Sequence, residues 1–186
     1  MAESNEQQSS VPSAFKKEDA YQSLEIINTW ISNIDSKVSF ALALVGVLMG
    51  FIFSQGVPSA FETISKVQKL ADLGGAEIIA GLLVSILYLS SLGCILCLVM
   101  AIVARTKETG NVTSAFFFGT ISAMTLQDYK NKVGSITDEQ LLEEVEEQIH
   151  TNSKICTLKS KWYNRGIKFL AVTIVLWFVC MVFQLI

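Results

Sequence analysis

The residue types that carry chemistry in proteins are few in this chain, and they do not fall into reactive patterns. The sole histidine, His150, has no second histidine or cysteine pair spaced to share a metal ion. Cys94 and Cys97 have the spacing of a thiol redox motif or half a zinc site, but without a second ligand pair they are better explained as small packing residues. Gly74 and Gly75 are not followed by the lysine and serine or threonine of a phosphate-binding loop. We therefore predict that the protein is not an enzyme and has no metal or cofactor.

The basic residues that precede the last apolar stretch are the strongest candidates for binding a ligand. Ammonium and guanidinium groups bind phosphate oxygens well, and a cluster of them suits an anionic nucleotide. The same group could instead only anchor the chain at anionic lipid headgroups and set its topology. Both interpretations stay open for Lys154, Lys159, Lys161 and Arg165.

Segment 111–135 is expected to be the least regular part of the chain outside the membrane. Three consecutive aromatic residues, Phe116 to Phe118, precede Gly119 there. We favour an aromatic turn that packs under the membrane. The alternative is a lid whose rings stack on a planar ligand such as a nucleobase.

Three windows without charged residues or histidine predict an integral membrane protein. Apolar residues make up 51% of the chain and charged residues only 17%, which argues against a soluble enzyme. The net charge of −3 gives no basic excess that would suggest nucleic acid as a partner. A membrane helix needs roughly 20 mostly apolar residues, and Pro58 disfavours helix at the residue before it. We place the spans at about 38–54, 78–104 and 169–186.

The distribution of Lys and Arg predicts the orientation of these spans. Only Lys66 and Lys69 lie between the first two spans, whereas the other twelve precede the first span or lie in 105–168. Short loops with many basic residues stay in the cytoplasm. We therefore expect a cytoplasmic N-terminus, a cytoplasmic region at 105–168 and a C-terminus outside.

Two of the spans are predicted to continue into long cytoplasmic helices. An apolar stripe with alternating spacings of three and four runs from Leu24 to Val45, which indicates one helix from about Glu18 to Phe53. Thr137 and Gln140 have the spacing of a capping box at the start of another helix, which no Pro or Gly interrupts before Gly166. Residues 1–17 are expected to form a disordered tail, and 18–186 a single helical membrane domain.

The apolar stripes of these helices must be buried against each other or against another copy of the chain. Gly46 and Gly50 form a small-residue pair four positions apart, a spacing that permits close packing of membrane helices. The predicted fold class is thus an all-α integral membrane protein with three transmembrane helices in a helical bundle, assembled as a homo-oligomer in the lipid bilayer.

Three segments resemble, in the same order, motifs of the transmembrane effector family of Pycsar anti-phage systems. The first is 28–39, with the sequence NTWISNIDSKVS, at the start of the first span. The second is Phe117, Phe118 and Gly119 with Ser122 downstream, and the third is 148–155, QIHTNSKI, which leads into Lys161 and Trp162. The resemblance covers nearly the whole chain after its tail.

The resemblance implies a bacterial inner-membrane protein that responds to a cyclic nucleotide, made by a partner cyclase after phage infection, by impairing the membrane. No separate nucleotide-binding domain is evident in the sequence, so the helical cytoplasmic region itself is expected to bind the ligand. The candidate ligand-binding residues are Trp30, Asn33, Asp35, Lys37, Phe118, Asn152, Lys154, Lys159, Lys161 and Arg165.

Two other functions are considered on the sequence alone. One is a membrane scaffold whose cytoplasmic helices recruit a partner without any leak. A transporter or channel is disfavoured, because the spans contain no ionisable residue that would mark a substrate path.

Overall fold

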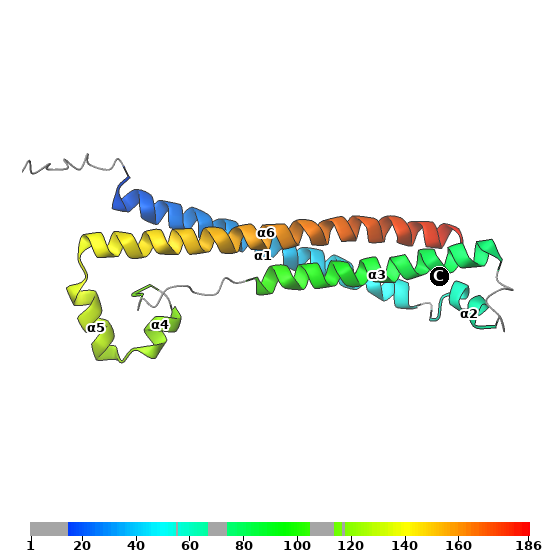
Figure 1. The fold of residues 1–186 in the computed structure, drawn as a ribbon, viewed down its shortest axis with the longest axis horizontal. Helices are drawn as coiled ribbons and strands as arrows, with labels where there is room; N and C mark the ends of the chain where they lie inside the picture. Colours follow the sequence, from blue (N-terminus) through cyan, green and yellow to red (C-terminus); the bar gives the residue numbers. More distant parts are fainter. Residues whose placement is uncertain (1–14, 55, 67–73, 105–113, 117) are drawn as a thin grey trace, which may run out of the picture. The chain divides into compact units, whose positions relative to one another are not determined.

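The computed structural model describes residues 15–54, 56–66, 74–104, 114–116 and 118–186 (Figure 1). Every regular element within these ranges is an α-helix, which confirms the predicted all-helical class for the described part of the chain. The predicted tail at 1–17 lies outside the described residues except for its last three. The helices are α1 (Lys17–Ser54), α2 (Ser59–Lys66), α3 (Gly75–Val103), α4 (Phe118–Ala123), α5 (Leu126–Ser135) and α6 (Asp138–Val182).

The chain divides into two compact units. We call the first the polar unit; it comprises Met1–Asn28 and Thr109–Asn152. The second, the membrane unit, comprises Thr29–Glu108 and Ser153–Ile186. Helices α1 and α6 contribute residues to both units. This division into units does not test whether 18–186 forms a single domain, so the single domain stays a prediction.

Within the described residues, three helices are long and apolar enough to cross a membrane, as the charge-free windows predicted. They are α1, α3 and α6. Helices α1 and α6 each extend well beyond their apolar segments, with lengths of 38 and 45 residues, so the predicted continuity of two spans with long polar helices is confirmed. Helix α3 begins slightly earlier than predicted, where the Glu77 carboxylate accepts a hydrogen bond of 2.8 Å from the Gly74 amide.

The third span ends earlier than predicted. Helix α6 stops at Val182, so the last four residues of the predicted 169–186 span are not helical. Gln184 adopts a positive φ of 54°, and the Leu185 amide donates to the Cys180 carbonyl at 2.9 Å. This is the hydrogen bond of a Schellman ending, which satisfies a carbonyl that the helix leaves without a partner. Apolar composition alone carries no signal for it.

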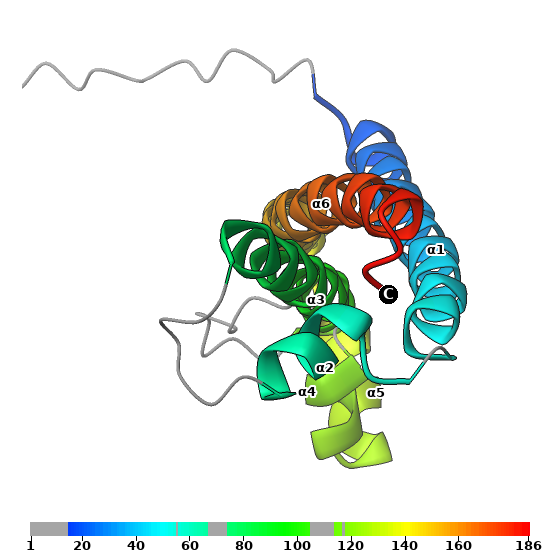
Figure 2. The same cartoon turned by 90° about the vertical axis from the view of Figure 1, so that its right-hand side faces the viewer.

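The predicted apolar stripe of α1 packs into the core of the membrane unit. Ile34, Val38, Ala41 and Val45 are buried there together with residues of α3 and α6. Figure 2 shows these three helices arranged around a common interior. The stripe faces α3 and α6 because its spacings of three and four keep it on one side of α1.

Small residues let α3 and α6 approach closely. A Cβ atom added to Gly166 would lie 2.7 Å from Leu98 Cδ2, and one added to Gly93 would lie 3.1 Å from the Phe169 ring. Ser90 and Thr173 share a buried hydrogen bond of 3.0 Å between the same helices. Ser90 and Gly93 of α3 therefore contact helix α6 of the same chain.

The segment between the first two spans contains a helix that the sequence analysis did not predict. Helix α2 begins after Pro58, whose carbonyl accepts from the amides of Phe61 and Glu62. Phe61 also continues a stack in which the rings of Phe53 and Tyr88 lie 5.3 Å apart and those of Phe61 and Tyr88 lie 6.3 Å apart. The aromatic contact of Phe61 with Tyr88 thus holds this short helix against α3.

Segment 111–135, predicted to be the least regular part outside the membrane, contains a short helix in its second half. Helix α5 occupies Leu126–Ser135, and Thr125 caps it by accepting a hydrogen bond of 3.1 Å from the Asp128 amide. The predicted capping box at the start of α6 is confirmed: Gln140 Oε1 accepts from the Thr137 amide at 3.1 Å, and Thr137 Oγ1 accepts from the Gln140 amide at 3.3 Å.

Candidate functional site

The membrane unit contains one charged side chain that contacts all three long helices. Lys159 of α6 is only 6% exposed, and its ammonium group donates at 2.6 Å to Asp35 Oδ1 of α1. It also donates at 3.1 Å to the carbonyl oxygen of Ile102, in the last turn of α3. Carbonyls at a helix C-terminus have no partner within their helix and carry partial negative charge, so a cation suits this position. We call these three groups the three-helix joint.

The other predicted cations lie on the outside of α6. Lys154, Lys161 and Arg165 are exposed, and their spacings of seven and four place them on one face of the helix. The Arg165 guanidinium lies 4.9 Å from the centre of the Trp162 ring, a cation–π contact. The predicted basic group therefore divides into a buried lysine within the joint and an exposed basic face.

The predicted ligand-binding residues of α1 also fall into two groups, an exposed set and one residue within the joint. Trp30, Asn33 and Lys37 are exposed, with spacings of three and four that place them on one face, and the Trp30 side chain is 58% exposed. Asp35 instead points to Lys159. A tryptophan this exposed beside an amide and an ammonium group could stack on a planar base while its neighbours donate hydrogen bonds.

Two predicted ligand-binding residues belong to the polar unit. The Asn152 side chain donates to Asn28 Oδ1 at 2.8 Å, so it joins α6 to α1. The backbone of Phe118 begins α4, but its side chain and all of Phe117 lie outside the described residues. The predicted aromatic turn is therefore described only at Phe116, which is 40% exposed.

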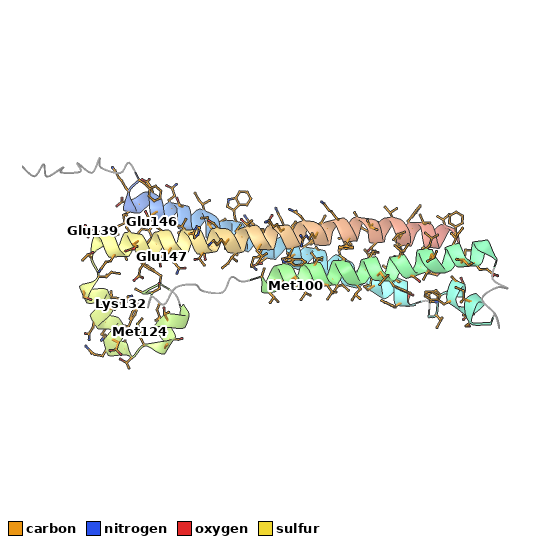
Figure 3. The ribbon with its side chains drawn as sticks, in the orientation of Figure 1. Met100, Met124, Lys132, Glu139, Glu146 and Glu147 are labelled. Carbon is orange, nitrogen blue, oxygen red and sulfur yellow. The ribbon has the colours of Figure 1, made fainter. Side chains whose placement is uncertain are left out.

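The polar unit also holds a cavity that the sequence analysis did not predict. Its volume is about 340 Å³. Glu144, at its wall, is 9% exposed; it accepts from the Ala115 amide at 2.7 Å and from the Lys132 ammonium at 3.0 Å. Figure 3 labels Lys132 on α5 and Glu147 on α6. The lining residues are Lys132, Ser135, Ile136, Gln140, Glu143, Glu144 and Glu147.

The charge of this cavity argues against a phosphate ligand there. Three carboxylates line it, and its one lysine is already paired with Glu144. An anionic phosphate would face net repulsion. The spacing of Glu143, Glu144 and Glu147 on one side of a helix was the available sequence signal, but it did not show that Lys132 of α5 would pair with Glu144. Within the described part of the chain, no three His, Cys, Asp or Glu residues are grouped to hold a metal ion.

The starts of α1 and α6 are joined by an exposed ion pair. Lys17 Nζ lies 2.8 Å from Asp138 Oδ1. This hydrogen bond lowers the pKa of the Asp138 carboxyl and raises the pKa of the Lys17 ammonium. Both groups are charged, and the ion pair is complete, when the pH lies between the lowered pKa of Asp138 and the raised pKa of Lys17. It is lost as the pH falls through the lowered pKa of Asp138 or rises through the raised pKa of Lys17.

Comparison with known proteins identifies the family. A model of the Pycsar effector protein domain matches residues 19–186. The chain belongs to the Pycsar effector family. The Pycsar effector protein GmPycTM of Gulbenkiania mobilis is 34% identical over 177 residues, which cover 86% of this chain and 88% of that protein. No solved structure matches the chain.

Membership in the Pycsar effector family confirms the resemblance drawn from the three motifs, all of which lie within the matched residues. This membership implies a membrane effector in a cyclic-nucleotide-signalled anti-phage system. The proteins of this family act as effectors rather than as enzymes. The three apolar helices agree with a membrane location.

Proposed function

We propose that this protein senses a cyclic nucleotide made by a partner cyclase and then impairs the bacterial inner membrane by opening a leak. The observation that carries the proposal is the extent of the family match, because residues 19–186 include the apolar segments of α1, α3 and α6 and every candidate ligand-binding residue. The N-terminus and residues 105–168 face the cytoplasm, and the C-terminus lies outside. The distribution of basic residues supports this orientation.

The ligand binds to exposed residues of α1 and α6 that lie next to the cytoplasmic ends of their apolar segments. Lys154, Lys161 and Arg165 supply the positive charge for a phosphate, and exposed aromatic side chains such as Trp30 supply a stacking surface for a base. Lys159 is not part of this surface, because Asp35 and the Ile102 carbonyl already occupy its ammonium group. A ligand can shift the arrangement of the helices only if it binds one arrangement better than another.

A test in cells separates this proposal from the scaffold alternative. The chain is expressed in bacteria with a nucleotide cyclase, and the membrane potential is followed with a voltage-sensitive dye. We expect depolarisation within minutes when both proteins are present, but not with a cyclase lacking its catalytic carboxylates. Cells that keep their potential with every cyclase product tried would favour the scaffold, which recruits a partner without a leak.

Assembly of several copies is part of the proposal. Gly46 and Gly50 are exposed on α1, and no described atom outside their own helix backbone lies within 4 Å of an added Cβ, so the described residues do not cover the face that the sequence marked for close packing. A second copy of α1 fits such a face, because small residues let two membrane helices approach closely.

Cross-linking measures this contact. Gly46→Cys should form disulfide-linked dimers in oxidised membranes at several times the yield of Leu44→Cys, which places an exposed thiol on another side of the same helix. Equal yields from both positions would contradict an interface at this face. The wild-type chain, whose four cysteines are free, measures the background.

A further inference from the structure

The three-helix joint lies where the apolar segments of α1 and α6 meet their polar continuations, at the C-terminal end of α3. On the side of the apolar segments, Val38, Leu98 and Ala101 are completely buried. Lys159 is the described charged residue most completely buried in this unit, and its hydrogen-bond partners come from the other two helices. One ammonium group therefore fixes α6 to both neighbours at the same level.

The geometry of the joint makes it sensitive to movement of α6. The two hydrogen bonds of 2.6 and 3.1 Å diverge from a single nitrogen to α1 and α3. Rotation or sliding of α6 by a fraction of a turn would break both together and leave a charge in an apolar setting, which is unfavourable. Asp35 is different, because 43% of its side chain is exposed and water can hydrate it after the contact breaks.

We propose that the three-helix joint is the lock that holds the effector in its closed state. The joint opens when α6 moves, and this movement is what ligand binding at the exposed basic face must drive. The lock rests on the proposed function, since it assumes that the protein can form a leak. Weakening the joint shifts the resting population toward the open arrangement without any ligand.

Purified protein in vesicles that contain a self-quenched dye tests the lock. Asp35→Asn removes the negative partner and keeps the shape, so the variant should fold, and we expect its nucleotide-free dye release to be about ten-fold faster than that of the wild type. Lys159→Met should give a similar increase. Lys168→Met is the matched control, because it removes a lysine from an exposed position of the same helix, and its release should equal that of the wild type.

A double variant distinguishes loss of the lock from general damage. Asp35→Leu with Lys159→Met replaces the ion pair by apolar contact, which often preserves stability, so release should return toward the wild-type rate. Exchange of the charges, Asp35→Lys with Lys159→Asp, should still leak because it turns a carboxylate toward the Ile102 carbonyl. Leakage of the apolar double variant at the rate of Lys159→Met would overturn the lock.

The wild type is tested in the same vesicles with cyclic AMP, cyclic GMP, cyclic CMP and cyclic UMP in turn. Release by the wild type with a nucleotide, combined with wild-type behaviour of Asp35→Asn and Lys159→Met without one, would overturn the lock and leave the proposed function standing. Release by the two variants while the wild type ignores every nucleotide would support the lock and count against cyclic mononucleotides as the signal. No release from any protein would overturn the lock and count against cyclic mononucleotides as the signal.

Discussion

Gly166→Leu should lower the melting temperature of the detergent-solubilised protein by about 10 °C. A Cβ atom at this position would lie 2.7 Å from Leu98 Cδ2, 2.9 Å from Leu98 Cγ and 3.5 Å from Cys97 Cβ, so a larger side chain must push α6 away from α3. The Cys94 thiol also donates to the Gly166 carbonyl at 3.4 Å. Overpacking of this kind costs about 3 kcal/mol, and each kcal/mol lowers the melting temperature of a chain of this size by about 2–4 °C.

Gly134→Leu is the matched control for this substitution. Gly134 lies inside α5, and no atom lies within 4 Å of its added Cβ, so the larger side chain meets no obstacle. Leucine has the higher helix propensity, so the control should leave the melting temperature unchanged or raise it slightly. Equal melting curves for Gly166→Leu and the wild type would show that α3 and α6 do not pack closely at Gly166.

The parts of the fold that the sequence predicted correctly depend on local patterns. The spans follow from windows without charge, because an ionised side chain in lipid is costly wherever the helix points. The capping box at Thr137 was readable because its two partners lie three residues apart. The buried stripe of α1 was readable because a helix repeats its faces every three to four residues.

The elements that sequence reasoning missed depend on contacts between distant residues. Helix α2 is held by the stack of Phe61 on Tyr88, and its eight residues are too few to show a periodic pattern. The cavity wall at Glu144 exists because the Ala115 amide and the Lys132 ammonium reach the same carboxylate. No local pattern relates residues 115, 132 and 144, so composition and spacing could not predict this contact.

In the candidate site, too, the local pattern was predictable from the sequence and the contact between distant residues was not. Lys159 was grouped with three other cations, although it lies three residues after Cys156 and three before Trp162, two side chains that pack against the core of the membrane unit. This spacing places Lys159 on the same face as the two apolar residues, and it was the available signal that Lys159 is buried and needs a counter-ion. The choice of Asp35 as the counter-ion was not readable, because it depends on how α1 and α6 are aligned along their lengths.

The separation of Lys159 from its neighbours changes which substitution can test ligand binding. Reversing the charge of Lys159 would place a carboxylate against Asp35 and the Ile102 carbonyl, so the membrane unit itself would be disturbed. Lys161 lies two residues further on the exposed side of the same helix. A charge reversal there alters the proposed binding surface and leaves the joint intact.

Lys161→Glu should weaken binding of the activating cyclic nucleotide by about 100-fold. The wild-type ammonium group contributes a charge-assisted hydrogen bond to phosphate, worth about 1.5–3 kcal/mol, and the substituted carboxylate repels the same phosphate. Equilibrium dialysis of the purified protein against the nucleotide that depolarises wild-type cells measures the dissociation constant. The melting temperature should stay within about 2 °C of the wild type, because an exposed substitution changes stability by only about 0.5 kcal/mol.

Lys168→Glu controls for the loss of positive charge beside the membrane. It makes the same change at another exposed position of α6, so any effect of charge on insertion should appear in both variants. Labelling of single cysteines from outside the cell reports the orientation of each variant. If Lys161 binds the ligand, only Lys161→Glu loses nucleotide binding and both variants insert as the wild type does. If the basic residues serve as lipid anchors alone, both variants retain binding, and the orientation or the amount of inserted protein changes instead.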